Sequence, residues 1–362
     1  MRFNYKLIIA MLVLAIFAVG SVSAAENVTA DIVDGNVDEI VVDEVAIDDV
    51  STDAIEESTG NDEILTAVSY DVDASMNSTT INSYIDLANA SGGGTINFAA
   101  GNYTDMALIL KSNVHLIGGA NVILTGTGST HVIEVANVEN FTISGFKING
   151  NDPTGASVSA IHGSFATNGV ISGNTLYNAK NGININKKFD NLTIENNNIY
   201  GITYDGISLA NPQGNNIFSS LVGATIRNNN ISSGEYGMFI GGSFKGTISG
   251  NRITGSDVGS QFLGKPNNSS GHLYASIYGN YISGVTTGIE LFNPDVIYLN
   301  MYLNNIYTVD PSNNYAIAYN SFFAKATGGH IYVTLNILSG LINQTLINQF
   351  DTFLFNSGYT IC

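Results

Sequence analysis

Thr193-Ile194-Glu195-Asn196-Asn197-Asn198-Ile199 is the stretch that decides the fold, because its pattern returns along most of the chain. The slot of Ile194 holds an apolar anchor in seven further copies: Ile143, Ile171, Ile226, Ile248, Ile277, Met301 and Val333. Three residues after the anchor, every copy except the first has an asparagine: Asn174, Asn197, Asn229, Asn251, Asn280, Asn304 and Asn336. The copies recur on average about every 27 residues, which is a period typical of stacked repeats.

Stacked coils explain the apolar columns and the asparagine column together. A sharp corner between two strands favours Asn or Gly, which tolerate left-handed backbone angles, so we expect the repeated asparagine to take that conformation. At a strand spacing of about 4.8 Å, the amide of each asparagine also reaches the side-chain carbonyl of the next. The pattern predicts an all-β right-handed parallel β-helix, a single-stranded solenoid with three short strands per coil and a structural asparagine column.

Each coil also has a short strand that begins with glycine, such as Gly182 to Ile185, Gly206 to Leu209 and Gly288 to Leu291. Alternation along a strand predicts which of its side chains face the core. We expect the following to face inward: Ile183, Ile185, Ile207, Leu209, Ile289 and Leu291. We expect the following to face outward: Asn184, Ser208 and Glu290.

Residues 1–24 have the layout of a signal peptide. Arg2 and Lys6 precede an apolar run from Leu7 to Val19, which is short for a membrane span, and small residues follow up to Ala24. An uncleaved membrane anchor is the alternative interpretation. No second apolar run is long enough for a span, so we expect an exported protein, at the cell surface or extracellular, without a transmembrane helix in the mature chain.

Residues 25–74 are expected to form a disordered acidic spacer. Between residues 26 and 86 the chain has 17 acidic side chains and no Lys or Arg, whereas from residue 100 onward it has 13 acidic and 10 basic ones. The net charge of −18 therefore belongs mainly to the N-terminal part. Without a clustered basic surface, nucleic acid is not an expected partner. The single cysteine, Cys362, excludes an intrachain disulfide.

We expect the β-helix domain to span residues 75–362, with a cap at each end. Ser78 or Thr79 is expected to cap a short N-terminal helix, because the apolar residues between Ile81 and Ala88 fall on one helical face. Such a helix covers the open first coil, whose unpaired backbone groups otherwise invite aggregation. At the other end, residues 341–350 are expected to form a closing helix or a last irregular coil.

The segment Ser91-Gly92-Gly93-Gly94-Thr95-Ile96-Asn97-Phe98-Ala99-Ala100-Gly101-Asn102-Tyr103, followed by the repeat copies, resembles the pectate-lyase-like right-handed β-helix superfamily. The pattern is similar in particular to the adhesin-like surface proteins of methanogenic archaea, over residues 75–340. The resemblance implies the fold. It leaves the activity open, because the superfamily includes lyases, hydrolases, epimerases and non-catalytic binding proteins.

The chain departs from the catalytic motifs that the resemblance implies. Polygalacturonase-like members carry Asn-Thr-Asp, Asp-Asp, Gly-His-Gly and Arg-x-Lys, but here the only Asp-Asp lies in the spacer and Arg-x-Lys is missing. Pectate-lyase-like members need an Arg or Lys beside calcium-binding Asp residues. After the signal peptide the only arginines are Arg227 and Arg252, which lie in different slots of the corner.

One acidic group remains as a candidate catalytic site. Asp205, Glu235 and Asp257 each lie one or two residues before the glycine that opens a strand, on successive coils. Stacking would bring the three carboxylates together as an acid/base pair or as a Ca²⁺ site. The alternative interpretation is that these are solvated acids in loops.

Tyrosines are enriched in the last third of the chain, where Tyr278 and Tyr302 share an outward slot. Aromatic planes stack on the apolar faces of sugar rings. Tyr278, Tyr302 and the outward Glu290 are therefore the candidate ligand-binding residues, although such rings also stack on each other along a β-helix. The five histidines are dispersed and show no metal-ligand spacing, so no metal site is expected apart from the Ca²⁺ alternative.

The sequence favours an exported, adhesin-like β-helix protein that binds a polysaccharide, a cell-surface glycan or another surface partner, without catalysis and without a cofactor. The alternative is a polysaccharide-active enzyme, a lyase or a glycoside hydrolase, that uses Asp205, Glu235 and Asp257. A purely architectural role in the envelope is the third hypothesis.

Overall fold

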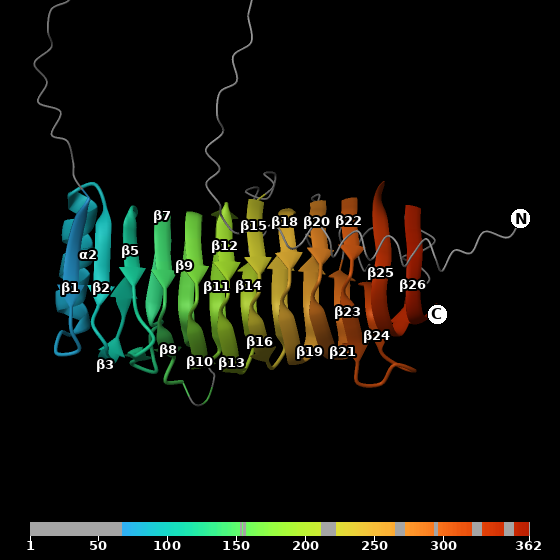
Figure 1. Ribbon diagram of the computed structural model, residues 1–362, viewed down its shortest axis with the longest axis horizontal. Coiled ribbons are helices and arrows are strands. Elements are labelled where there is room, and N and C mark those ends of the chain that lie inside the picture. The colour runs from blue at the N-terminus through green and yellow to red at the C-terminus, as the bar shows by residue number, and fades with distance from the viewer. Residues whose placement is uncertain are drawn as a thin grey trace, which may run out of the picture. The chain divides into compact units, whose positions relative to one another are not determined.

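The computed structural model describes residues 67–152, 154, 157–210, 222–264, 272–292, 296–320, 328–343 and 351–361. The expected signal peptide, and the expected spacer up to residue 66, lie outside these residues. Within them, the strands stack into a right-handed parallel β-helix (Figure 1), as the repeats predict. No helix in this part of the chain is long and apolar enough to cross a membrane.

Each coil contributes strands to three faces of the solenoid. The first face contains β4 (Leu108–Ile109), β14 (Asp205–Ala210), β17 (Tyr236–Gly241) and β24 (Tyr315–Asn320). The second contains β1 (Val68–Val72), β2 (Gly94–Phe98), β5 (Val114–Ile117), β12 (Leu192–Glu195), β15 (Val222–Arg227), β18 (Phe244–Ser249), β20 (His272–Tyr278), β22 (Val296–Tyr302) and β26 (Asp351–Ile361). The third contains β3 (Gly101–Met106), β6 (Val122–Gly126), β8 (Lys147–Asn149), β10 (Thr175–Ala179), β13 (Asn198–Ile202), β16 (Asn230–Ser233) and β23 (Asn305–Thr308).

Among the described residues, seven longer strands bend from one face into the next, so the faces are continuous. One is β26, which follows β25 from the second face onward, and six others lie earlier in the chain. They are β7 (Ile133–Ser144), β9 (Ser159–Ser172), β11 (Asn181–Asp190), β19 (Arg252–Leu263), β21 (Tyr281–Phe292) and β25 (Gly328–Ile342). Neighbouring coils pair in parallel, and the repeat slots are register partners: Ile194 pairs with Ile171 on one side and with Ile226 on the other. The register therefore determines which side chains from distant parts of the chain meet.

The apolar columns form the core along the stack. The anchor residues are buried throughout, from Ile143 to Val333. The side chains expected to face inward are all buried as well: Ile183, Ile185, Ile207, Leu209, Ile289 and Leu291. Of the three expected outside, Asn184 and Glu290 are half-buried, whereas Ser208 is buried. Ser208 is the register partner of Phe239 on the next coil, and its side chain hydrogen bonds to Asp205.

The asparagine column forms a hydrogen-bonded ladder, as expected. Asn229 Nδ2 donates to Asn251 Oδ1 at 2.9 Å and to the carbonyl of Ile194 at 2.9 Å. Its own side-chain oxygen accepts the backbone N–H and the side-chain amide of Asn197, both at 3.0 Å. The same contacts continue from Asn174 to Asn336, and all seven asparagines are buried. Their polar groups are therefore satisfied inside the corner.

The ladder asparagine does not itself adopt the left-handed conformation, which corrects the expectation from sequence. The residue just before the ladder slot does so in all eight copies, including the first, where the slot holds Phe146. These residues are Gly145, Gly173, Asn196, Asn228, Gly250, Gly279, Leu303 and Leu335, with φ between 54° and 80°. The turn is made at this exposed position, while the asparagine that follows keeps its amide inside the corner, where it can reach the next coil. The two roles belong to neighbouring residues.

The N-terminal end of the stack is covered by α2 (Ser78–Ala90), as predicted. Its N-cap is Asn77 rather than Ser78 or Thr79, because the Asn77 side-chain oxygen accepts the N–H of Thr80 at 3.0 Å. β1 precedes this helix and pairs in parallel with β2, so the solenoid begins before residue 75. At the other end, β26 pairs in parallel with β25 and continues the stack, while residues 344–350 lie outside the described residues.

Candidate functional site

The three candidate carboxylates lie in different environments at the start of the first face. Asp205 is only 4% exposed, Glu235 is half-buried and Asp257 is exposed. Asp205 is the register partner of Tyr236, so it lies one position out of step with Glu235. Glu235 and Asp257 share a slot, because the residues that follow them, Tyr236 and Val258, are register partners. Asp205 and Glu235 are therefore close enough to interact electrostatically, whereas Asp257 lies at the surface.

Asp205 is the carboxylate with unusual electrostatics. Burial, opposed by a hydrogen bond from Ser208 and reinforced by the charge of Glu235, raises the pKa of Asp205 to about 7, and Lys180 acts weakly in the lowering direction. One of its oxygens, Oδ1, is buried without a hydrogen-bond partner. A carboxyl group that exchanges its proton near neutral pH has the property that general acid–base catalysis requires.

Two tyrosines surround this carboxylate. Burial, followed by the charge of Glu235, raises the pKa of Tyr236 to about 12. Tyr204 contacts Tyr236 edge to face, and the ammonium of Lys180 lies 5.2 Å from the centre of the Tyr204 ring. The Asp205 region is therefore a compact cluster of acids, phenols and one amine at the outside of the solenoid.

Glu290, a candidate ligand-binding residue, has its carboxylate engaged by the protein. Gln261 Nε2 donates to one oxygen at 2.6 Å and Asn320 Nδ2 donates to the other at 2.5 Å. Glu290 therefore lies on the first face with both oxygens in use, away from the tyrosines of the second face with which the sequence grouped it.

A groove of about 500 Å³ lies on the second face, and we call it the tyrosine trough. Two outward columns line it. The first consists of the register partners Lys245, Tyr274, Tyr298 and His330. The second consists of Thr247, Ser276, Asn300 and Tyr332. The rings of Tyr274 and Tyr298 stack at 4.9 Å with planes 12° apart, and Tyr298 and Tyr332 are each 44% exposed.

The candidate pair Tyr278 and Tyr302 stacks in the same manner, at 4.9 Å and 9°. This pair occupies the next outward slot of the same strands and does not line the trough. The tyrosine-rich last third of the chain contains the rings of the trough, but the enrichment alone does not show which slot borders a hollow. The distinguishing signal is the small side chain two residues further on: Tyr274 is followed by Ser276 and Tyr298 by Asn300, which leave space beside the rings.

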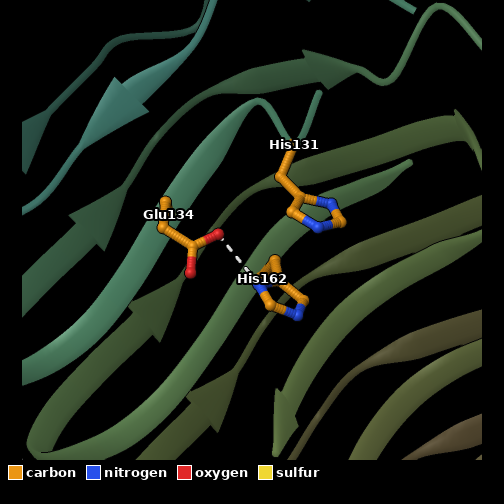
Figure 2. A group of neighbouring side chains, drawn as sticks. All are labelled: His131, Glu134 and His162. Atoms are coloured by element: carbon orange, nitrogen blue, oxygen red, sulfur yellow. Dashed lines mark hydrogen bonds and ion pairs between the residues drawn. The ribbon is translucent and has the colours of Figure 1, made fainter. Parts of the chain in front are cut away.

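A third group consists of His131, Glu134 and His162, which we call the histidine cluster (Figure 2). Glu134 on β7 and His162 on β9 are register partners, and His162 Nδ1 lies 2.8 Å from Glu134 Oε2. The rings of His131 and His162 stack at 4.0 Å. Burial, followed by the neighbouring His162, lowers the pKa of His131, while the charge of Glu134 acts in the raising direction. Sequence spacing did not reveal the group, because His162 lies one coil away from His131 and Glu134.

The stacked parallel coils and the asparagine ladder make the protein a right-handed parallel β-helix protein. The family model described as "Periplasmic copper-binding protein (NosD)" matches residues 87–332, and the chain belongs to this NosD family. No curated protein matches the sequence.

Solved structures with the same fold include proteins of different activities. An exopolygalacturonase from Thermotoga maritima is 13% identical with a TM-score of 0.54, over 80% of this chain and 86% of that one. PfbA, a surface adhesin of Streptococcus pneumoniae, is 15% identical with a TM-score of 0.54, over 81% and 92%. The tailspike of E. coli bacteriophage HK620 in complex with a hexasaccharide is 13% identical with a TM-score of 0.51, over 80% and 61%. At these identities the likeness shows the fold alone.

Proposed function

We propose that this protein binds carbohydrate at the tyrosine trough and acts as an exported, adhesin-like protein of the cell surface. The observation that carries the proposal is the pair of stacked tyrosines beside a polar floor, in a groove of about 500 Å³. This volume lies within the range of roughly 300–1,000 Å³ that is usual for small-ligand sites.

The trough offers both kinds of contact that a sugar needs. The Tyr274 and Tyr298 rings are held parallel by the register of β20 and β22, so the edges that they expose are rigid. The hydroxyl and amide groups of Thr247, Ser276 and Asn300 line the floor and can hydrogen bond to sugar hydroxyls. Four coils at a spacing of about 4.8 Å give the trough a length of roughly 14 Å, which suits a short oligosaccharide.

The charge of the trough favours an anionic glycan. Lys245 is exposed at one end, and none of the side chains that the structure describes along the trough is acidic. Among the described residues, no ion pair involves Lys245. An ammonium group without a carboxylate partner attracts a uronate or another acidic sugar. We therefore infer that acidic polysaccharides bind more tightly than neutral ones.

The test is binding of the purified protein to a panel of acidic and neutral oligosaccharides, with Tyr298→Ala and Lys245→Gln as the variants. We expect Tyr298→Ala to weaken binding at least about tenfold, because stacking on an aromatic ring is lost. Lys245→Gln should lower affinity for acidic ligands only. Tyr302→Ala is the matched control, since it removes a ring from the neighbouring stack outside the trough. Equal binding by the wild type and Tyr298→Ala would refute the trough as the site.

The fold is compatible with this use of an exposed face. PfbA is a surface adhesin, and the HK620 tailspike structure holds a hexasaccharide. These proteins share the architecture rather than identifiable residues, so the proposal depends on the side chains of the trough.

A second candidate function is cleavage of a polysaccharide at Asp205. It is favoured by one observation, a buried carboxyl group with a pKa of about 7 and an oxygen without a partner, next to Glu235 and two tyrosines. In this hypothesis Asp205 donates a proton to the leaving oxygen and Glu235 is the second carboxyl group of the catalytic pair. The same polysaccharide panel, scored for new reducing or unsaturated ends, tests it. Activity that disappears in Asp205→Asn and persists in Asp257→Asn would establish it, and a panel without products would exclude it.

A further inference from the structure

We propose that His131, Glu134 and His162 bind one divalent transition-metal ion on the first face of the solenoid, separate from the trough. One ligand atom from each residue lies within 4.8 Å of the others, and all three side chains are half-buried. Figure 2 shows the two rings overlapping, with the Glu134 carboxylate beside them and directed at His162. The proposal is independent of carbohydrate binding, because it involves other coils and another face.

The backbone fixes two of the three donors in place. Glu134 and His162 are register partners on the adjacent parallel strands β7 and β9, and their side chains are in contact at 2.8 Å. Donors on strands are positioned more accurately than donors on loops. His131 lies just before β7, outside a regular strand, so its ring is the one that can turn when an ion binds.

The hydrogen bonds show what an ion would displace. Asn186 Nδ2 lies 3.2 Å from His162 Nε2, so the ring proton of His162 is on Nδ1 and is shared with Glu134. An ion between Nδ1 and the carboxylate replaces this proton. The Asn186 amide can then turn its oxygen toward Nε2, and the resulting Nε2–H···O contact is the usual outer support of a metal-bound histidine.

His131 becomes the third metal ligand when its ring leaves the stack with His162. Its Nδ1 accepts the N–H of Ser159 at 3.0 Å, and the lone pairs of two stacked, nearly parallel rings do not converge on one point. A half-turn of the His131 ring about χ2 releases the Ser159 N–H and turns an unprotonated nitrogen toward Glu134. One lost hydrogen bond is small beside the metal bond that replaces it.

The donor set selects the class of metal. Two imidazoles and one carboxylate suit Zn²⁺ and Cu²⁺, whereas Ca²⁺ and Mg²⁺ prefer oxygen ligands throughout. Cu²⁺ binds a given set of nitrogen and oxygen donors more tightly than the other divalent ions of the first row. Three protein ligands also leave positions open for water or for an exchangeable partner. We therefore expect the order Cu²⁺, then Zn²⁺, with no measurable binding of Ca²⁺ at the cluster.

The test uses the full chain, titrated with Cu²⁺ by calorimetry in a buffer that does not bind metal, together with the electron paramagnetic resonance spectrum of the complex. We expect one tight equivalent with a spectrum that shows nitrogen donors. The His131→Ala/His162→Ala variant should bind at least about 100-fold more weakly, beyond the cost of losing an outer partner alone. His115→Asn is the matched control, because His115 is another half-buried histidine, which contacts Thr142 and is not part of the histidine cluster.

A second measurement avoids variants whose folding is altered. Chemical modification of histidines in the wild-type protein, mapped by mass spectrometry, should show that one equivalent of Cu²⁺ protects His131 and His162 and leaves His115 reactive. Equal protection of all histidines, or protection of none, would overturn the proposal. So would equal affinity of the double variant, which would show that Cu²⁺ is held elsewhere in the chain.

Discussion

At the residue scale, the buried carboxyl group of Asp205 makes folding stability depend on pH. Its pKa is about 7 in the folded protein against a usual value of 3.8, so between these values the folded chain holds a proton that the unfolded chain has released. The contribution of Asp205 to stability is therefore largest at low pH and falls by about 1.4 kcal/mol per pH unit across that window, for a total of roughly 4 kcal/mol. Above about pH 7 the contribution is constant.

The variant Asp205→Asn should remove this dependence, because the amide does not ionise. We expect it to unfold at a higher denaturant concentration than the wild type at pH 8 and at a similar concentration at pH 4, as measured by urea titration followed by circular dichroism. Asp257→Asn, at an exposed position, provides the control and should leave the pH profile unchanged. A wild-type stability that is the same at pH 5 and pH 8 would contradict the assignment.

Two leucines occupy a backbone position that suits them poorly. Leu303 and Leu335 have φ of 56° and 54° at the left-handed corner slot, where the other coils have Gly or Asn. Left-handed angles cost a residue with a bulky side chain roughly 1–2 kcal/mol. Both leucines are about half exposed, so little apolar burial offsets the strain.

Leu335→Asn should therefore stabilise the protein by about 0.5–1 kcal/mol, since Asn tolerates this conformation better. The reverse change in an earlier coil, Asn196→Leu, should destabilise by a similar amount, and thermal unfolding of the two variants measures both effects. A loss of stability in Leu335→Asn would mean that the exposed leucine side chains have packing partners that outweigh the strain.

At the element scale, the asparagine ladder should act as a buried cross-link between coils. Asn251 donates to Asn280 and to the carbonyl of Ile226, and it accepts both the backbone and the side-chain N–H of Asn229. Asn251→Ala removes these contacts and leaves buried groups unsatisfied, at a cost of about 3 kcal/mol or more. Asn230→Ala is the comparison, because Asn230 makes one exposed side-chain contact with Asn198 and should cost under about 1 kcal/mol.

The secondary-structure elements also show which features of the fold can be predicted from the sequence. Apolar anchors and the column from Asn174 to Asn336 predicted the fold and the ladder, because a stacked coil imposes the same requirement on every copy. The left-handed position was assigned one residue too late, since Asn and Gly occur side by side at the corner and composition alone does not separate the turn from the ladder.

The candidate sites were harder to predict because they depend on register across whole coils. Glu134 and His162 meet because β7 and β9 align them, although their coils differ in loop length from those that follow. Likewise, Tyr298 borders the trough and Tyr302 does not, and the difference lies in the small side chains beside Tyr298. Such contacts follow from strand pairing, which a repeat pattern fixes only where the anchor motif is present.

At the scale of the whole molecule, the solenoid is a one-dimensional stack whose ends are its weak points. Each coil is stabilised by its two neighbours, but β1, the first strand that the structure describes, pairs within that part of the chain with β2 alone. Unpaired strand edges recruit other chains, and terminal caps with a polar outer side prevent this in stacked-repeat proteins. Figure 1 shows α2 at this end of the stack, and its Ile81, Ile85 and Ala88 are buried.

Ile85→Asp should therefore cause association rather than only local loosening, because a charge at a fully buried site detaches α2 and exposes the first coil. Light scattering and size-exclusion chromatography should show concentration-dependent assembly, with the β-rich circular dichroism spectrum retained. Leu87→Asp is the matched control on the same helix. Because Leu87 is half exposed, this change should neither detach α2 nor cause association. If Ile85→Asp lost α2 and still associated no more than Leu87→Asp, the helix would not be what protects the exposed edge of β1 from association.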